Sequence, residues 1–185
     1  MHRLTVSVLA VLGLVTIDST ARADGDRALS ASVGWATFST TGKAIGRQSA
    51  PSLTPEVGGS LSAAYEQAFS TDLGVRGELA GALFYGGQQA GETKTSYALL
   101  ADTGIVFRFD VLKYVPYAFA GVGGVAQTGG PLDRGLDFVL VIGGGVDWLQ
   151  SREHSLGLEA RVASFGGDVT VLTVGLRGTV RWGFL

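Results

Sequence analysis

The sequence contains no cysteine, only four prolines and two histidines, and few charged residues. Without cysteine, no disulfide framework can hold the fold. The prolines are few and the glycines follow no period of three, which excludes a collagen-like helix. Charged residues make up 16% of the chain, and the formal net charge of −2 provides no basic field to attract nucleic acid. These shortages exclude disulfide-stapled, collagen-like and nucleic-acid-binding proteins.

Apolar residues and glycine, by contrast, are abundant. The 185 residues are 46% hydrophobic, include 29 glycines, and have a mean hydropathy of +0.31. Disordered chains are poor in apolar residues, so this chain is expected to fold. Its length suits one domain of ordinary size. The composition predicts a compact protein with an unusually large apolar surface. Whether that surface faces the interior of the protein or its surroundings decides the class of protein.

Residues 1–23 have the pattern of a secretory signal peptide. A short start containing Arg3 is followed by an apolar run, and the stretch closes on Ala21-Arg22-Ala23, an A-x-A cleavage pattern. The apolar run is too short for a comfortable membrane span. We therefore expect residues 1–23 to direct export and residues 24–185 to form the mature domain. That domain contains no stretch of 18 apolar residues free of charge, so no transmembrane helix is expected.

Eight segments after residue 27 alternate with period two, and none holds the 3.6-residue period of an amphipathic helix. In the last segment Leu172, Val174 and Leu176 share one face, while Arg177 and Arg181 lie on the other. Several segments are longer than the usual five or six residues of a soluble strand. The pattern predicts an all-β fold, an eight-stranded antiparallel up-and-down transmembrane β-barrel. The expected strands cover residues 28–39, 56–68, 73–85, 96–109, 115–126, 136–148, 155–165 and 169–184.

In each segment one face is free of charge, and this face is assigned to lipid. In the fifth segment, Val115, Tyr117, Phe119 and Val125 are placed on that lipid face. An arginine facing lipid at the bilayer midplane would cost about 2–4 kcal/mol, so the charged faces are expected to line the lumen. The inward charges are then Glu66, Arg76, Glu78, Asp102, Arg108, Asp137, Asp147, Glu159, Arg161, Arg177 and Arg181.

The connections between the segments agree with a barrel of the bacterial outer membrane. With both chain ends in the periplasm, the connections 40–55, 86–95, 127–135 and 166–168 are extracellular, and all but the short last one are longer than the inner turns. Aromatic residues gather near strand ends, where the two interfaces of the membrane would lie. The expected localisation is the cell outer membrane, with outer-membrane lipid and lipopolysaccharide as surroundings.

Three motifs in the second half of the chain carry a resemblance to a known family. They are Pro116-Tyr117-Ala118-Phe119-Ala120-Gly121-Val122-Gly123, Ile142-Gly143-Gly144-Gly145-Val146-Asp147-Trp148 and Leu156-Gly157-Leu158-Glu159-Ala160-Arg161. With these motifs the chain resembles the OmpA/OmpX-like family of eight-stranded outer-membrane β-barrels, which implies the same fold but specifies function poorly. The terminal strand, with Trp182 and Phe184, resembles the signal read by the outer-membrane assembly machinery. The resemblance makes that machinery an expected partner.

Six charged residues near the middle of the strands form the candidate site: Arg76, Glu78, Asp102, Glu159, Arg161 and Arg177. Eight strands enclose a lumen just wide enough for side chains to fill. We predict a charge-paired structural network there, because buried charges persist only when partnered and arginine can bind two carboxylate oxygens at once. Three alternatives stay open. The chain could be a soluble periplasmic barrel with an apolar interior, which a need for detergent during extraction would exclude. The charges could line a wet pore, or the barrel could be an OmpW-like narrow channel or carrier for small apolar molecules, with Phe84, Val139 and Val141 in the upper lumen.

No catalytic site, cofactor or metal is expected. A hydrolase would need a nucleophile beside a histidine base, yet the only histidines are His2 in the leader and His154 in a periplasmic turn. The chain has no histidine pair at ligand spacing and no G-x-G-x-x-G turn between a strand and a helix. The predicted function is a non-catalytic outer-membrane barrel with a structural or surface-interaction role in the envelope.

Overall fold

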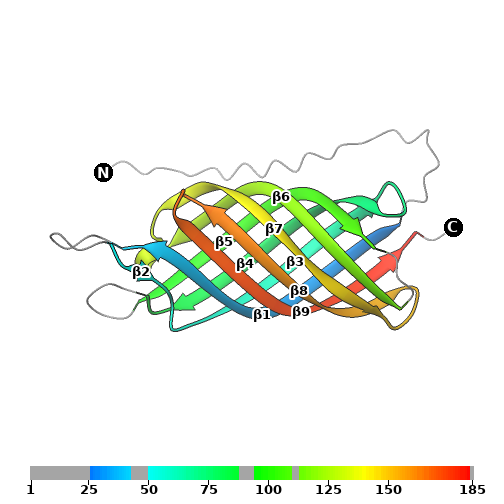
Figure 1. The fold of residues 1–185 in the computed structure, drawn as a ribbon, viewed down its shortest axis with the longest axis horizontal. Coiled ribbons are helices and arrows are strands. Elements are labelled where there is room, and N and C mark those ends of the chain that lie inside the picture. The colour runs from blue at the N-terminus through cyan, green and yellow to red at the C-terminus, as the bar shows by residue number, and fades with distance from the viewer. Residues whose placement is uncertain (1–25, 43–49, 88–93, 110–112, 184–185) are drawn as a thin grey trace, which may run out of the picture.

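The computed structural model describes residues 26–42, 50–87, 94–109 and 113–183. Among these residues, no helix is long and apolar enough to cross a membrane. The elements, shown in Figure 1, are β1 (Arg27–Thr41), β2 (Ser52–Leu53), β3 (Val57–Ala68), β4 (Leu73–Tyr85), β5 (Thr95–Arg108), β6 (Tyr114–Thr128), the short 3₁₀ helix η1 (Gly130–Leu132), β7 (Gly135–Leu149), β8 (His154–Phe165) and β9 (Val169–Trp182).

The eight long strands form one closed antiparallel barrel. Neighbours pair in the order β1-β3-β4-β5-β6-β7-β8-β9, and β9 returns to pair with β1. The two-residue strand β2 adds only a short pairing with Thr40 and Thr41 at the end of β1. Closure leaves no free edge, so the backbone hydrogen bonds of the ladder are satisfied around the ring. The predicted fold class is confirmed, and each long strand begins and ends within two residues of its predicted limits.

The two ends of the barrel differ. Strand β1 begins and β9 ends at one of them, the terminal end, on the right in Figure 1. The opposite end, which carries β2 and η1, is called the loop end. The β8–β9 connection at the loop end is a tight turn in which Gly166 and Gly167 have φ angles of 60° and 79°. Residues that carry a side chain rarely adopt such positive φ angles, so glycine at both positions permits the turn.

The outer wall is apolar around the ring. Large hydrophobic side chains on every long strand point outward, and Leu136, Leu176 and Leu140 are 79%, 66% and 54% exposed. Monomeric soluble proteins rarely expose a continuous apolar surface of this extent. A closed barrel is also one of the two backbone arrangements that lipid tolerates. The wall therefore suits a hydrocarbon environment.

One strand faces the opposite way from the sequence prediction. Val115, Tyr117, Phe119 and Val125 of β6 are buried in the lumen, whereas Val122 is exposed on the outer wall. The reason lies on the neighbouring strand β7. Register places Phe119 opposite Gly143 and Tyr117 opposite Gly145, and a Cβ atom at Gly143 would lie 2.5 Å from Phe119 Cζ. The inward glycines of β7 leave the space that the two rings of β6 fill.

Candidate functional site

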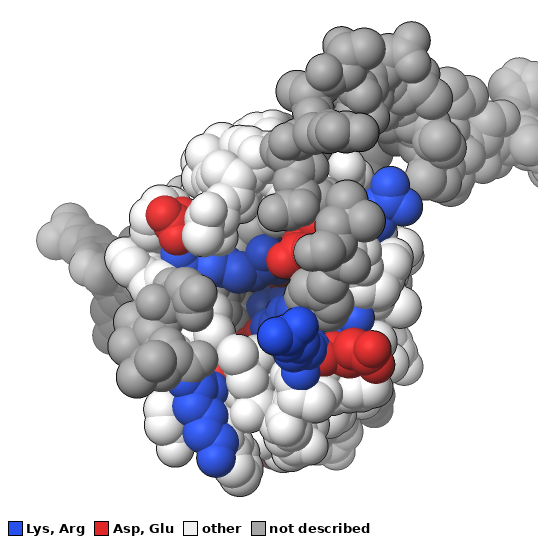
Figure 2. Space-filling model, turned by 90° about the vertical axis from the view of Figure 1, so that its right-hand side faces the viewer, with Lys and Arg blue, Asp and Glu red and all other residues white. Residues whose placement is uncertain are grey.

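Two layers of different chemistry fill the lumen. Alternation along the strands sends every second residue inward, so inward residues from different strands meet in the lumen. Nearer the terminal end lies the ion-pair network, which comprises Glu66, Arg76, Glu78, Arg108, Glu159, Arg161 and Arg177. Nearer the loop end lies the apolar plug, which comprises Phe38, Phe84, Leu132, Val139, Val141, Phe165, Val169 and Val171. Figure 2 views the terminal end and shows charged side chains gathered in its mouth.

Arg76 is the centre of the ion-pair network. Its Nη1 donates to Glu159 Oε2 and its Nη2 to Glu78 Oε2, each at 2.9 Å, and Nη2 also donates to Glu159 Oε1 at 3.1 Å. The side chain is 2% exposed, and its guanidinium carbon lies 4.0 Å from the centre of the Phe119 ring. A planar guanidinium can pair with carboxylates along its edge while its face stacks on an aromatic ring. Arg76 uses both modes.

Arg177, on β9, joins two of the glutamates. It donates from Nη2 to Glu66 Oε1 at 2.6 Å and from Nη1 to Glu159 Oε2 at 3.4 Å. Its guanidinium lies 4.5 Å from the centre of the Tyr117 ring, and the Tyr117 hydroxyl donates to Glu159 Oε2 at 2.9 Å. Glu159 therefore accepts hydrogen bonds from three side chains, which offsets the cost of burying its charge.

Three further pairs complete the network. Arg161 pairs with Glu78, Arg108 pairs with Glu66, and Arg76 Nη1 lies 3.5 Å from Glu66 Oε1. Each glutamate of the network thus contacts at least two arginines. Closer to the terminal end, Arg181 Nη2 lies 2.7 Å from Asp147 Oδ2 in a separate ion pair.

Five of the six predicted site residues lie in this network, and Asp102 stands apart. It lies opposite Glu78 in the β4–β5 register, so two acidic side chains are neighbours. Within the part of the chain that the structure describes, Asp102 forms no ion pair, and its Oδ2 is buried without a hydrogen-bond partner. Asp102 is thus a neighbour of the network rather than one of its ion-paired members.

Three side chains take part in the central group besides the predicted ones: Glu66, Arg108 and Tyr117. Glu66 and Arg108 are predicted inward charges, but they lie close to strand ends and so fall outside the predicted mid-strand site. The sequence pattern predicts a lipid-facing Tyr117, which the structure contradicts. Gly143 and Gly145 lie opposite the two rings of β6 only in the register of the paired strands, so the pattern of β6 by itself gives no signal for the inward direction of Tyr117.

The apolar plug closes the lumen between the ion-pair network and the loop end. Phe38 and Phe84 meet edge to face, with ring centroids 5.1 Å apart, and Val139 and Val141 are fully buried beside them. The predicted inward direction of Phe84, Val139 and Val141 is confirmed. Leu132 was not predicted here, because it belongs to η1 in the β6–β7 connection rather than to a strand; it is fully buried in the mouth.

A small cavity lies between the two layers. It has a volume of about 20 Å³ and is lined by residues that include Leu100, Arg161, Phe165 and Thr173. This is room for about one water molecule. It is far below the roughly 300–1,000 Å³ of typical small-molecule pockets.

Arg134 fastens the β6–β7 connection across the loop end. It pairs with Asp168 in the β8–β9 turn, with Nη2 lying 2.7 Å from Asp168 Oδ2, and Nη2 also donates to Thr40 Oγ1 at 3.2 Å.

The hydrogen bond from Arg134 holds the pKa of Asp168 below its ordinary value. The pair therefore contributes stability at neutral pH, and this contribution is lost only as the pH falls through that lowered pKa. The connection that carries Leu132 stays fastened throughout the mildly acidic range.

The fastening predicts a change in proteolysis. Arg134 is itself a trypsin site, so in Asp168→Asn we expect cleavage after Arg134 in folded, membrane-inserted protein to be several-fold faster than in wild type. The asparagine removes the charge that holds the arginine. Mass spectrometry of the fragments checks this. Asp133→Asn is the matched control, because among the described residues Asp133 accepts a single long side-chain hydrogen bond, 3.5 Å from Thr128 Oγ1. Equal rates for all three proteins would show that the pair does not restrain the connection.

The remaining candidate residues fall in other places. His154 lies at the start of β8, exposed, with Nδ1 3.4 Å from Ser151 Oγ. Trp182 ends β9, and its ring centroid lies 6.3 Å from that of Tyr65 on the outer wall. His2, Phe184 and the expected leader 1–23 lie outside the described residues. Among the residues described, no group of three or more His, Cys, Asp or Glu side chains could hold a metal ion.

A closed eight-stranded antiparallel barrel with an apolar wall and an ion-paired lumen has the architecture of small outer-membrane β-barrels. Comparison with solved structures finds the same fold. Neisserial surface protein A is similar at a TM-score of 0.58 and 13% identity, covering 84% of this chain and 97% of that protein. The attachment invasion locus protein Ail of Yersinia pestis gives 0.56 and 18%, covering 86% and 100%. OprG of Pseudomonas aeruginosa gives 0.54 and 14%, covering 84% and 95%.

Comparisons at the level of sequence give no match. No protein-family model and no curated protein matches this chain. The similarity to the three barrels therefore concerns the fold.

Proposed function

We propose that this protein is a non-catalytic integral barrel of the bacterial outer membrane, with a lumen closed to solutes and a structural or surface-interaction role in the envelope. The observation that carries the proposal is the filled lumen. Paired charges occupy one half of its length and a packed apolar plug occupies the other. A barrel with this packed interior acts as a rigid support for the connections between strands at its two ends.

The apolar wall supports placement in a membrane. Its long strands have 12–15 residues, enough to cross the hydrocarbon layer at a tilt. Under this proposal residues 1–23 direct export, the terminal end faces the periplasm and the loop end faces outward. Lipid and lipopolysaccharide surround the wall, and the outer-membrane assembly machinery inserts the barrel by reading the terminal strand with Trp182 and Phe184.

The packed interior argues against the alternative of a narrow channel or carrier for small apolar molecules. The upper lumen is apolar, as a carrier would require, but Phe38, Phe84 and Leu132 fill it. The cavity beneath them, at about 20 Å³, has no room for an organic ligand.

Conductance in planar lipid bilayers tests the proposal. We expect no stable single-channel steps from the folded wild-type protein, because a solute would have to displace buried ion pairs and then a packed apolar layer. A general porin inserted into the same bilayers is the positive control. Gel mobility of heated and unheated samples verifies that the barrel is folded. Reproducible unitary steps from folded wild-type protein would refute the closed lumen.

A further inference from the structure

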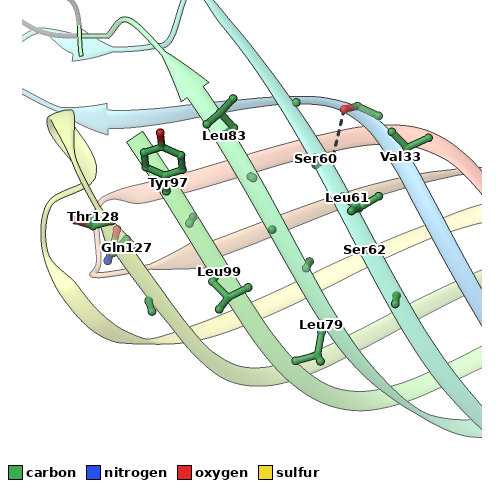
Figure 3. Close-up of a pocket in the computed structure, with 18 of the residues that line it drawn as sticks. Val33, Ser60, Leu61, Ser62, Leu79, Leu83, Tyr97, Leu99, Gln127 and Thr128 are labelled. Carbon is green, nitrogen blue, oxygen red and sulfur yellow. Dashed lines mark hydrogen bonds between the residues drawn. The ribbon is translucent and has the colours of Figure 1, made fainter. Parts of the chain in front are cut away.

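A hollow ringed by four leucines opens on the outer wall at Gly81. In the registers of β3–β4 and β4–β5, Gly81 lies directly opposite Leu61 on one side and Leu99 on the other. Leu79 and Leu83 lie two residues away along β4 and therefore point to the same face. Figure 3 shows the four leucine side chains around this part of the wall.

The hollow is open space rather than a packed glycine contact. A Cβ atom added at Gly81 would meet no atom within 4 Å. The inward Gly143, in contrast, has the Phe119 ring against it. The four surrounding leucines are 48–64% exposed, so they stand out from the wall around a point where one side chain is missing.

The hollow forms part of a broad, open groove of about 1,140 Å³ on the outer wall. Small residues, among them Ala31, Ala63 and Ala126, extend it on both sides of the leucine ring. Its polarity changes along its length. The outward-pointing side chains at the middle of the barrel are those of leucines and alanines, whereas the hydroxyl-bearing Tyr97 and Thr128 line the groove where β5 begins and β6 ends, at the loop end (Figure 3). Ser60 and Ser62 also border the middle stretch, but their hydroxyls have partners within the barrel: Ser60 Oγ donates to the Gly34 carbonyl at 3.5 Å, and the buried Ser62 Oγ lies 2.8 Å from Ser32 Oγ.

We propose that the hollow at Gly81 seats one hydrocarbon chain of an outer-leaflet membrane lipid, whose polar part lies at Tyr97 and Thr128. This inference rests on the proposed function, which places the wall in the membrane and the loop end outside. The order of polarity along the groove matches that of such a lipid, with the polar part at the membrane surface and the chain toward the middle. A hydrocarbon chain in the hollow contacts leucine side chains on four sides. Elsewhere on the convex outer wall, a hydrocarbon chain contacts protein side chains on one side only.

A second copy of the barrel fits the same groove less well. The leucines that would face a partner stand out from the wall, and the space between them is one side chain wide. A flexible hydrocarbon chain can follow such a hollow, but the convex wall of a second barrel would rest on the leucines and leave the hollow empty. An empty hollow forfeits the contacts of its lining.

Lipid retention in native mass spectrometry tests the proposal. Wild type, Gly81→Leu and Gly77→Leu are inserted into nanodiscs of dimyristoylphosphatidylcholine, released in the gas phase, and the lipids still bound are counted as collision energy rises. Gly77 is the matched control. It lies four residues earlier on the same face of β4, and a Cβ there also meets no atom within 4 Å. We expect wild type and Gly77→Leu to retain one lipid at energies that remove the others, and Gly81→Leu to lose it.

Three other results would each contradict either the lipid seat or the proposed function. Equal retention by Gly81→Leu and wild type would refute the lipid seat. A wild-type dimer that Gly81→Leu dissociates, with Gly77→Leu still dimeric, would refute it in favour of a second copy. Both of these results leave the barrel inserted in lipid. Failure of all three proteins to insert into vesicles, checked by flotation and by heat-dependent gel mobility, would instead overturn the proposed function.

Discussion

Replacing Arg76 by methionine is expected to lower the free energy of unfolding by about 3–5 kcal/mol. Methionine keeps much of the length of the arginine side chain but removes the cation that both Glu78 and Glu159 contact at 2.9 Å. Arg161 and Arg177 would still pair with these glutamates, but the Arg76 position would leave buried negative charge only partly compensated. A buried carboxylate that loses its partner costs more free energy than the ion pair contributed.

Urea unfolding of the barrel in lipid vesicles measures this loss, followed by tryptophan fluorescence and gel mobility. Arg152→Met is the control, since Arg152 is exposed in the β7–β8 turn and its replacement should change stability by less than about 0.5 kcal/mol. If Arg76→Met lowers the free energy of unfolding no more than Arg152→Met does, the ion-pair network does not stabilise the barrel.

Replacing Phe84 by alanine is expected to cost about 3–5 kcal/mol of unfolding free energy. The ring is fully buried in the apolar plug and packs edge to face on Phe38. Strands β1 and β4 are fixed by the closed ladder, so the surrounding side chains can fill only part of the space left by the ring. Such a cavity adds to the cost of the lost apolar contacts.

The neighbouring residue provides a control on the opposite face of the same strand. Leu83 is 48% exposed on the outer wall, and lipid chains can replace the contacts that Leu83→Ala removes. We expect its cost to be below about 1 kcal/mol by this argument. The same urea unfolding in vesicles compares the two variants. Similar losses for both would show that the two faces of β4 are not inside and outside as the structure places them.

The two layers of the lumen resist passage for different physical reasons. A solute entering from the terminal end would have to break charge-assisted hydrogen bonds between groups that cannot be left unpaired. A solute entering from the loop end would have to open a packed apolar layer that includes Leu132 from the β6–β7 connection. The layers are connected through Arg161, which pairs with Glu78 and also lines the small cavity beneath the plug.

The alternation of apolar and polar residues was enough to predict the strands and most of their faces. Charges settle the face wherever a strand carries them, as Arg76 and Glu78 do on β4, because a charge on the lipid side would be costly. Strand β6 has apolar residues on both faces and no charge on either. Its own pattern therefore could not decide the direction of Tyr117 and Phe119. The space beside Gly143 and Gly145 on β7 decided it, and that space exists only once the two strands are paired.

The sequence by itself therefore determined the class of fold, the limits of the strands and the inward direction of the charges, because all three follow from the two-residue period and the cost of charge in lipid. Only the tertiary structure decided which charges meet. Arg76 and Glu159 are 83 residues apart and come together through closure of the ring. Closure also placed Leu132 in the mouth and surrounded Gly81 with four leucines. A strand's pattern determines which way its residues point, and the register between strands determines what they meet.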